Sequence, residues 1–179
     1  MKRPITYDDL RQLPEGAGYE VIGGALVHEP APSIAHQLVV KRVVIALDAF
    51  AAPRGSGLVI PSPVDVRLAE SEVYHPDVVF VSAERRAIVG EASIEGAPDL
   101  VVEVLSVSSA YNDLRRKRDV YERGGVREYW IVDPMRRTVE VLESVGASFV
   151  LRRERADGVV SSRVLAGFEI DVDEIFRFD

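Results

Sequence analysis

The amino-acid sequence predicts an α/β protein of the α+β mixed-sheet type. We expect a central mixed β-sheet flanked by helices, with extra antiparallel strands near the C-terminus. Three continuously apolar runs, bounded by Pro or Gly, are typical of interior strands covered on both faces. These runs occupy residues 77–81, 99–105 and 128–133. Two other segments repeat apolar residues at helical spacing, and beyond Pro134 short strand-like runs alternate with turn residues.

The composition is that of one ordinary globular domain spanning residues 1–179, with 47% hydrophobic and 28% charged residues. The chain has no cysteine, which excludes a disulfide framework, a thiolate zinc site, an iron–sulfur cluster and a cysteine nucleophile. We expect no targeting or membrane segment, because the longest mainly apolar run, residues 38–52, is interrupted by Lys41, Arg42 and Asp48. A cytoplasmic location agrees with the lack of cysteine.

The N-terminal part predicts two helices and two pairs of strands. Thr6 opens the first helix, with Asp9 three residues later as in a capping box. Gly23-Gly24 is a tight-turn signal between two strands of a hairpin, and Ser33 is a suitable N-cap for a long helix. The helices are expected at residues 6–14 and 33–52, and the strands at 19–22, 25–28, 58–60 and 64–68.

The C-terminal part also predicts both helices and strands. A helix is expected from Asp113 to about Arg123, where Gly124-Gly125 ends it. Hairpin strands are expected at residues 138–142, 148–153 and 159–164. A short last helix begins at Asp171.

Three carboxylates interrupt apolar strands. Glu103 lies within Leu-Val-Val-Glu-Val-Leu, Asp77 begins Asp-Val-Val-Phe-Val, and Glu20 lies within a short strand. Burying an ionised group costs several kcal/mol unless it is paired or binds a metal. On neighbouring strands two such carboxylates would lie about 5 Å apart and would need a proton or a cation. Oxygen ligands without cysteine favour Mg²⁺ or Mn²⁺ over zinc.

Each carboxylate also has a structural interpretation. Glu103 could form a buried ion pair without further chemistry. Asp77 follows a proline and could simply begin a strand. Asp99, which also follows a proline, competes with Asp77 for the same role, although we expect it at a solvent-accessible strand edge. Glu20 could be a solvated residue at a strand end.

A lysine falls on the apolar face of the predicted helix at 113–123. Lys117 lies in the middle of the apolar stripe, where an amine needs a carboxylate or an anionic substrate. Two alternatives are an ion pair with Asp113 one turn earlier and an amine that extends from an apolar surface into solvent. The stripe consists of Ala110, Leu114, Val120 and Tyr121.

At these residues the chain resembles the PD-(D/E)XK nuclease superfamily, and more narrowly the bacterial Uma-two family described as restriction endonucleases. The resemblance extends from about Tyr7 to Val141. The matching segments are residues 19–24, His36, residues 76–78, residues 97–106, the series Asp113, Lys117 and Tyr121, and residues 125–134.

The resemblance implies a restriction-endonuclease-like core and a set of site residues. Asp77 and Glu103 would bind the divalent metal, and Glu20 would be the helper glutamate. The sequence departs from the superfamily two residues after Glu103, where Leu105 stands in place of the lysine. Lys117 on the following helix is the natural replacement, because its amine can reach the same site from another backbone position.

The expected function is that of a metal-dependent endonuclease that uses Mg²⁺ (or Mn²⁺) to hydrolyse phosphodiester bonds in nucleic acid, with DNA as the expected substrate. Tyr121 and Asp113 are expected accessory residues, and a homodimer is expected by analogy. One alternative is a catalytically inactive protein of the same fold that binds nucleic acid or acts as an assembly subunit. Another is a zinc hydrolase that uses His75 with Asp77.

His36 and His75 are candidate accessory residues of the expected site. The alternative for each is a structural role or simple exposure to solvent.

The charge distribution bears on the expected partner. The chain carries a net charge of −7, which argues against a protein that coats nucleic acid. Residues 106–137 differ, because they contain eight basic and five acidic residues, a net charge of +3. Arg115, Arg116 and Arg118 are the predicted nucleic-acid contacts, and a solvated helix face is the alternative. We therefore expect modest, metal-assisted and salt-sensitive binding.

Overall fold

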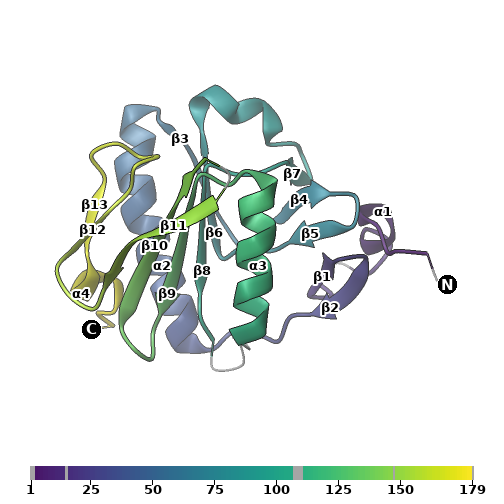
Figure 1. Cartoon of the computed structure of the whole chain (residues 1–179), viewed down its shortest axis with the longest axis horizontal. Coiled ribbons are helices and arrows are strands. Elements are labelled where there is room, and N and C mark those ends of the chain that lie inside the picture. Colours follow the sequence, from purple (N-terminus) through teal and green to yellow (C-terminus); the bar gives the residue numbers. More distant parts are fainter. Residues whose placement is uncertain (1–2, 15, 107–110, 147, 179) are drawn as a thin grey trace.

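The structure, a computed structural model, describes residues 3–14, 16–106, 111–146 and 148–178, without the side chains of residues 111–114 and 154. Its main element is a six-stranded sheet (Figure 1). In spatial order the strands are β11 (Ser148–Arg155), β10 (Thr138–Val145), β9 (Glu128–Asp133), β8 (Leu100–Val104), β6 (Val78–Ser82) and β3 (Gly57–Pro61). Only β8 and β9 pair in parallel, so this is the mixed sheet that the sequence predicts.

A second sheet lies beside the first and contains two strands that the sequence did not indicate. In order, its strands are β2 (Ala25–His28), β1 (Tyr19–Ile22), β5 (Glu72–Tyr74), β4 (Asp65–Ala69) and β7 (Ser93–Glu95). β5 and β7 have three residues each, which is too short for a periodic signal. The hairpin β1–β2 forms as predicted, and its turn residues Gly23 and Gly24 adopt φ values of 57° and 73°, which suit glycine.

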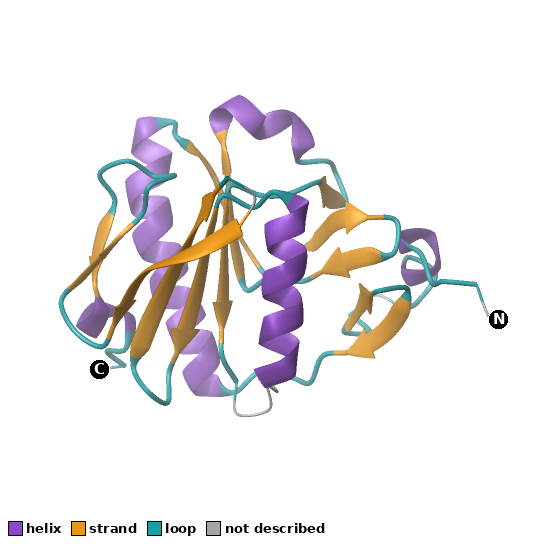
Figure 2. Ribbon diagram, viewed as in Figure 1, coloured by secondary structure: helices purple, strands orange, loops and turns teal. Residues whose placement is uncertain are grey.

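The helices cover opposite faces of the main sheet (Figure 2). α2 (Ile34–Ala51) packs on one face together with α4 (Val172–Ile175), while α3 (Tyr111–Gly124) lies on the other face beside the second sheet. The remaining helices are α1 (Tyr7–Leu10), η1 (Ala52–Arg54) and η2 (Ala83–Ile88). None of the helices in the described ranges is long and apolar enough to cross a membrane.

The alternation of side chains along the central strands explains the two cores. Val78 and Val102 contribute to the core beneath α2, whereas Val79 and Val101 contribute to the core shared with α3 and the second sheet. Both faces of β6 and β8 are therefore buried, as their continuous apolar runs predict.

The C-terminal strands differ in detail from the expectation. β10 extends three residues beyond the predicted end, to Val145, and the strand expected at 159–164 is shortened to β12 (Val159–Ser161). β12 pairs with β13 (Glu169–Asp171), which the sequence pattern did not indicate. Asp171 caps α4 by accepting a hydrogen bond from the backbone of Asp173 at 2.8 Å, so the predicted last helix begins where expected.

Asp99 corrects one expectation. We expected it at a solvent-accessible edge, but its side chain is completely buried. Its carboxylate accepts a hydrogen bond from the backbone N–H of Ser82 at 2.8 Å, and bonds from Arg85 at 3.2 Å and Arg127 at 3.0 Å. Burial raises the pKa of Asp99, but these donors more than compensate and hold the pKa below its usual value. Asp99 is thus a structural anchor between β6, η2 and the start of β9.

This anchor predicts a cost in stability. The substitution Asp99→Asn removes the charge that faces two guanidinium groups and replaces one acceptor oxygen by a donor. We expect it to lower the free energy of unfolding by about 1–3 kcal/mol, measured by urea denaturation. The exposed residue Asp48, substituted in the same way, is the control and should change the free energy by less than about 0.5 kcal/mol. Equal stabilities of the two variants would contradict the assignment.

Candidate active site

Asp77 and Glu103 lie opposite each other at one end of two neighbouring strands. β6 and β8 pair antiparallel with Val78 opposite Val102, so one further step of the register places Asp77 opposite Glu103. The backbone N–H of Val104 donates to Oδ2 of Asp77 at 2.7 Å, which fixes this end of the pair. Directly opposed side chains project from the same face of a sheet. Here it is the face that packs against α3 and the second sheet.

The amine of Lys117 reaches this pair from α3. Nζ lies 3.3 Å from Oε1 and 3.4 Å from Oε2 of Glu103. It also lies 3.1 Å from Oε1 of Glu20 and 3.4 Å from Oε1 of Glu29. The lysine side chain is only 5% exposed, which excludes the interpretation that its amine extends into solvent. The structure therefore brings together Glu20, Glu103 and Lys117, as the sequence hypothesis required.

Glu20 reaches the site from the second sheet and not from a strand next to β6 or β8. Its strand, β1, belongs to the second sheet and does not pair with β6 or β8. The side chain of Glu20 reaches Lys117 because the second sheet packs against α3, and the backbone N–H of His75 donates to Oε1 of Glu20 at 2.9 Å. Glu20, for which the resemblance implies a helper role, thus reaches Lys117 across the junction of the two sheets.

Tyr121 holds the other side of Glu103. It lies one turn after Lys117 on α3, is fully buried, and donates its hydroxyl to Oε1 of Glu103 at 2.7 Å. This contact fits the predicted accessory role. Asp113, the other predicted accessory residue, has a side chain outside the described residues, as do Ala110 and Leu114 of the predicted apolar stripe.

Asp77 is oriented by His36, one of the two candidate accessory histidines. Ser33 caps α2 by accepting a hydrogen bond from the backbone of His36 at 3.2 Å. The imidazole Nε2 of His36 then lies 3.2 Å from Oδ2 of Asp77. Among the described residues, both hydrogen bonds that the carboxylate of Asp77 accepts go to Oδ2. Oδ2 is thus occupied by the protein, while Oδ1 is the oxygen left to other partners.

His75 lies between two carboxylates of the second sheet and its hairpin. Nε2 lies 2.8 Å from Oδ1 of Asp65, and Nδ1 lies 3.4 Å from Oε2 of Glu29. Burial alone would lower the pKa of His75, but these two carboxylates raise it to about 9. Both ring nitrogens are therefore engaged by Asp65 and Glu29, whereas the zinc hypothesis for His75 and Asp77 requires one of them for the metal.

The site has more negative than positive charge. Burial raises the pKa of Glu103 most, Lys117 opposes it, and the nearby charges of Asp77 and Glu20 raise it again, so that the pKa is about 8. Burial also raises the pKa of Glu20. Three carboxylates contact the one ammonium and Asp77 lies close to Glu103, which leaves an acidic excess that a cation can neutralise.

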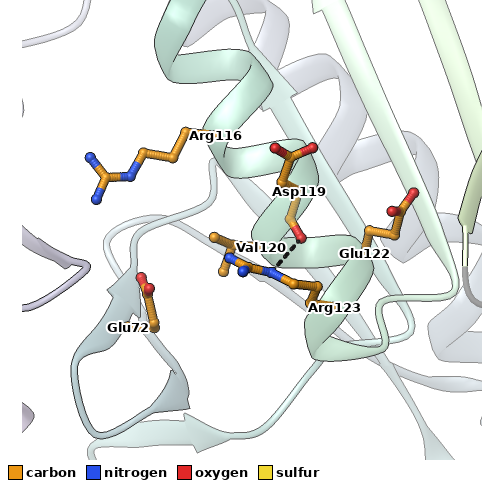
Figure 3. Close-up of a pocket in the computed structure, with 6 residues that line it drawn as sticks. All are labelled: Glu72, Arg116, Asp119, Val120, Glu122 and Arg123. Atoms are coloured by element: carbon orange, nitrogen blue, oxygen red, sulfur yellow. Dashed lines mark hydrogen bonds between the residues drawn. The ribbon is translucent and has the colours of Figure 1, made fainter.

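The arginines of α3 have different environments. Arg115 and Arg116 are exposed, as nucleic-acid contacts must be. Arg116 lines a hollow of about 320 Å³ between α3 and the second sheet, which also contains Arg123 (Figure 3). Arg118 is half-buried and donates to the backbone carbonyl of Phe149 at 3.0 Å, so its guanidinium is engaged within the fold. The complete lining is Glu72, Arg116, Asp119, Val120, Glu122 and Arg123.

Phe149 lies on the edge strand β11, and side chains of α3 bind both its backbone carbonyl and its backbone N–H. Its carbonyl accepts from Arg118, and its backbone N–H donates to Oε2 of Glu122. These contacts attach the edge of the main sheet to the helix that carries Lys117.

The sequence did not indicate one of the three carboxylates that contact Lys117. Glu29 lies just after β2, next to Pro30, in a stretch without strand or helix periodicity. A glutamate in such a loop is usually solvated, and its only signal is that it lies nine residues after Glu20 in the same hairpin. Its contact with Lys117 depends on the packing of the second sheet against α3.

The resemblance implies a divalent metal ion, and the side chains of the site must offer it suitable ligands. Within the described ranges, no group of three or more His, Asp or Glu side chains has the arrangement that could hold a metal ion. Two opposed carboxylates, Asp77 and Glu103, nevertheless suit Mg²⁺, which often takes one or two protein carboxylates and completes its shell with water and substrate phosphate. The residues therefore fit Mg²⁺ or Mn²⁺.

Fold and site together define a class, a nuclease-type mixed α/β fold with acidic residues at the ends of two central strands. The chain is similar to a solved structure described as a "putative nuclease belonging to DUF820" from Anabaena variabilis ATCC 29413. The TM-score is 0.81 at 20% sequence identity, over 97% of this chain and 98% of the other. This likeness confirms the predicted restriction-endonuclease-like fold.

The family follows from the sequence itself. The model of the Uma2 family, described as "Putative restriction endonuclease", matches residues 6–173. The chain belongs to the Uma2 family, as its motifs predicted. No curated protein matches the chain.

The buried carboxylate predicts how stability depends on pH. Because the pKa of Glu103 is about 8 in the folded chain and 4.5 ordinarily, the stability due to its protonated form is complete below pH 4.5. It is lost as the pH rises through 8. We therefore expect the free energy of unfolding of metal-free protein to fall between about pH 5 and pH 8, measured by denaturation in a chelator.

The variant Glu103→Gln should lose this part of the pH dependence, since the amide cannot ionise and its carbonyl can still accept from Tyr121. The exposed control Glu91→Gln should keep the wild-type profile. Parallel profiles for wild type and Glu103→Gln would contradict the assignment.

Proposed function

We propose that this protein is a divalent-metal-dependent endonuclease that hydrolyses phosphodiester bonds in DNA. The observation that carries the proposal is the opposed pair Asp77 and Glu103 with the buried ammonium of Lys117 against Glu103. Membership in the Uma2 family and the nuclease-type fold support it. A homodimer and a cytoplasmic location remain predictions.

Asp77 and Glu103 would hold Mg²⁺ or Mn²⁺. When bound, the metal supplies an activated water and neutralises charge on the phosphodiester. His36 orients Asp77 through Oδ2, and Tyr121 orients Glu103 through Oε1. Each metal-binding carboxylate is thus held by a partner on a helix, an arrangement that improves metal affinity.

Lys117 is the cation that the protein itself provides. Its ammonium is buried, so it acts in a medium of low dielectric where a positive charge strongly stabilises an anionic transition state. Three carboxylates contact the ammonium and hold it in the site. Glu20 keeps it close to Glu103 from the side of the second sheet.

The roles are tested by plasmid cleavage with Mg²⁺ or Mn²⁺. We expect wild-type protein to nick supercoiled DNA, and the variants Asp77→Asn, Glu103→Gln and Lys117→Met to lose at least about 100-fold in rate, because each removes charge that acts on the transition state. Lys41→Met, which changes an exposed lysine of α2, is the matched control and should cleave at the wild-type rate. Equal rates for all variants would contradict the assigned roles.

Metal binding provides a second readout. Titration calorimetry with Mn²⁺ is best done above pH 8, where Glu103 is ionised. Wild type should bind and Glu103→Gln should not. Absence of both binding and cleavage in the wild type would instead favour an inactive protein that binds nucleic acid or serves as an assembly subunit.

A further inference from the structure

Glu29 contacts both the ammonium of Lys117 and the imidazole of His75. Its Oε1 lies 3.4 Å from Nζ of Lys117, and its Oε2 lies 3.4 Å from Nδ1 of His75. Its backbone N–H donates to the carbonyl of Gly18 at 2.8 Å, which fixes the chain at the end of the hairpin β1–β2. Glu29 therefore bridges the lysine and the histidine from a defined backbone position.

The bridge continues into the second sheet. His75 contacts Glu29 on one side and Asp65, at the start of β4, on the other. Its Nε2 lies 2.8 Å from Oδ1 of Asp65. The order Asp65, His75, Glu29, Lys117 and Glu103 is a continuous series of neighbours in which acidic and basic groups alternate. Each member of the series therefore contacts an oppositely charged group.

The three carboxylates around Lys117 differ in exposure. The side chains of Glu20 and Glu103 are 2% and 10% exposed, whereas Glu29 is 34% exposed. Glu29 therefore marks the solvent side of the ammonium. It is also the one whose pKa is lowered: burial acts to raise the pKa of Glu29, but His75 and Lys117 outweigh it.

We propose that Glu29 is a positioning residue that draws the ammonium of Lys117 toward the solvent side of the site, and that His75 orients Glu29 for this purpose. An amine held only by Glu20 and Glu103 would point into the protein. The contact with Glu29 keeps it where an entering phosphodiester would meet it. The catalytic meaning of this arrangement rests on the proposed nuclease function, whereas the positioning itself does not.

The positioning is tested by the reactivity of the amine. The chain has only three lysines, Lys2, Lys41 and Lys117, so brief acetylation in metal-free buffer and peptide mass spectrometry can follow Lys117 against the exposed Lys41. We expect Glu29→Gln to lower the relative labelling of Lys117 about two- to fivefold, the range for loss of a partly exposed ion pair, because the amine then points into the protein. Glu91→Gln should leave the ratio unchanged.

Two substitutions of His75 separate its two contacts. The amide nitrogen of asparagine takes the place of Nδ1, which faces Glu29, and that of glutamine takes the place of Nε2, which faces Asp65. We expect His75→Gln to lower the labelling of Lys117 as Glu29→Gln does, and His75→Asn to lower it less. If His75 only stabilised the fold, the two variants would not differ in the labelling of Lys117 in this order.

The outcomes are decisive in either direction. Wild-type labelling of Lys117 in Glu29→Gln, with an unchanged melting temperature, would overturn the proposal, and equal labelling in both His75 variants would overturn the part played by His75. Should Glu29→Gln fold poorly, Glu29→Asp keeps the charge but shortens the side chain, and an unchanged ratio there would also count against it. If wild-type protein cleaves no DNA, the proposed function fails, while labelling still decides the positioning.

Discussion

The burial of one ammonium among several carboxylates is the constraint on which the rest of the site depends. Lys117 cannot be taken out of water without partners, and its partners come from β1, the end of β2 and β8. Satisfying this one group therefore requires α3, the main sheet and the second sheet to meet at one place. The same requirement collects the acidic residues that a metal would need, so folding and assembly of the site share one interaction.

Much of the fold could be predicted because its main signals are local. Continuous apolar runs identified β6, β8 and β9, and helical spacing identified α2 and α3. Ser33 located the start of α2 and Gly124-Gly125 the end of α3. The three-residue strands β5 and β7 could not be predicted, since they are too short to show a period. Without them, the division into two sheets was also out of reach, because it depends on long-range pairing.

The residues of the site also differ in whether a local sequence pattern indicates them. Glu103 and Lys117 were visible because each is a charged residue at an apolar position, and the environment of Lys117 matched that reasoning. Glu29 and the contact between His36 and Asp77 were not visible, since neither depends on a local pattern. Asp99 shows the opposite error, because its position after a proline suggested solvent, whereas the side chains of Arg85 and Arg127 close over it.

The attachment of Phe149 to α3 has a consequence for solubility. An edge strand normally offers unpaired peptide groups on which a strand of another molecule can add. At Phe149 the side chains of Arg118 and Glu122 already occupy both groups. A neighbouring chain could not extend the sheet at Phe149 without displacing them, so the helix that carries Lys117 also closes this position of the edge to a further strand.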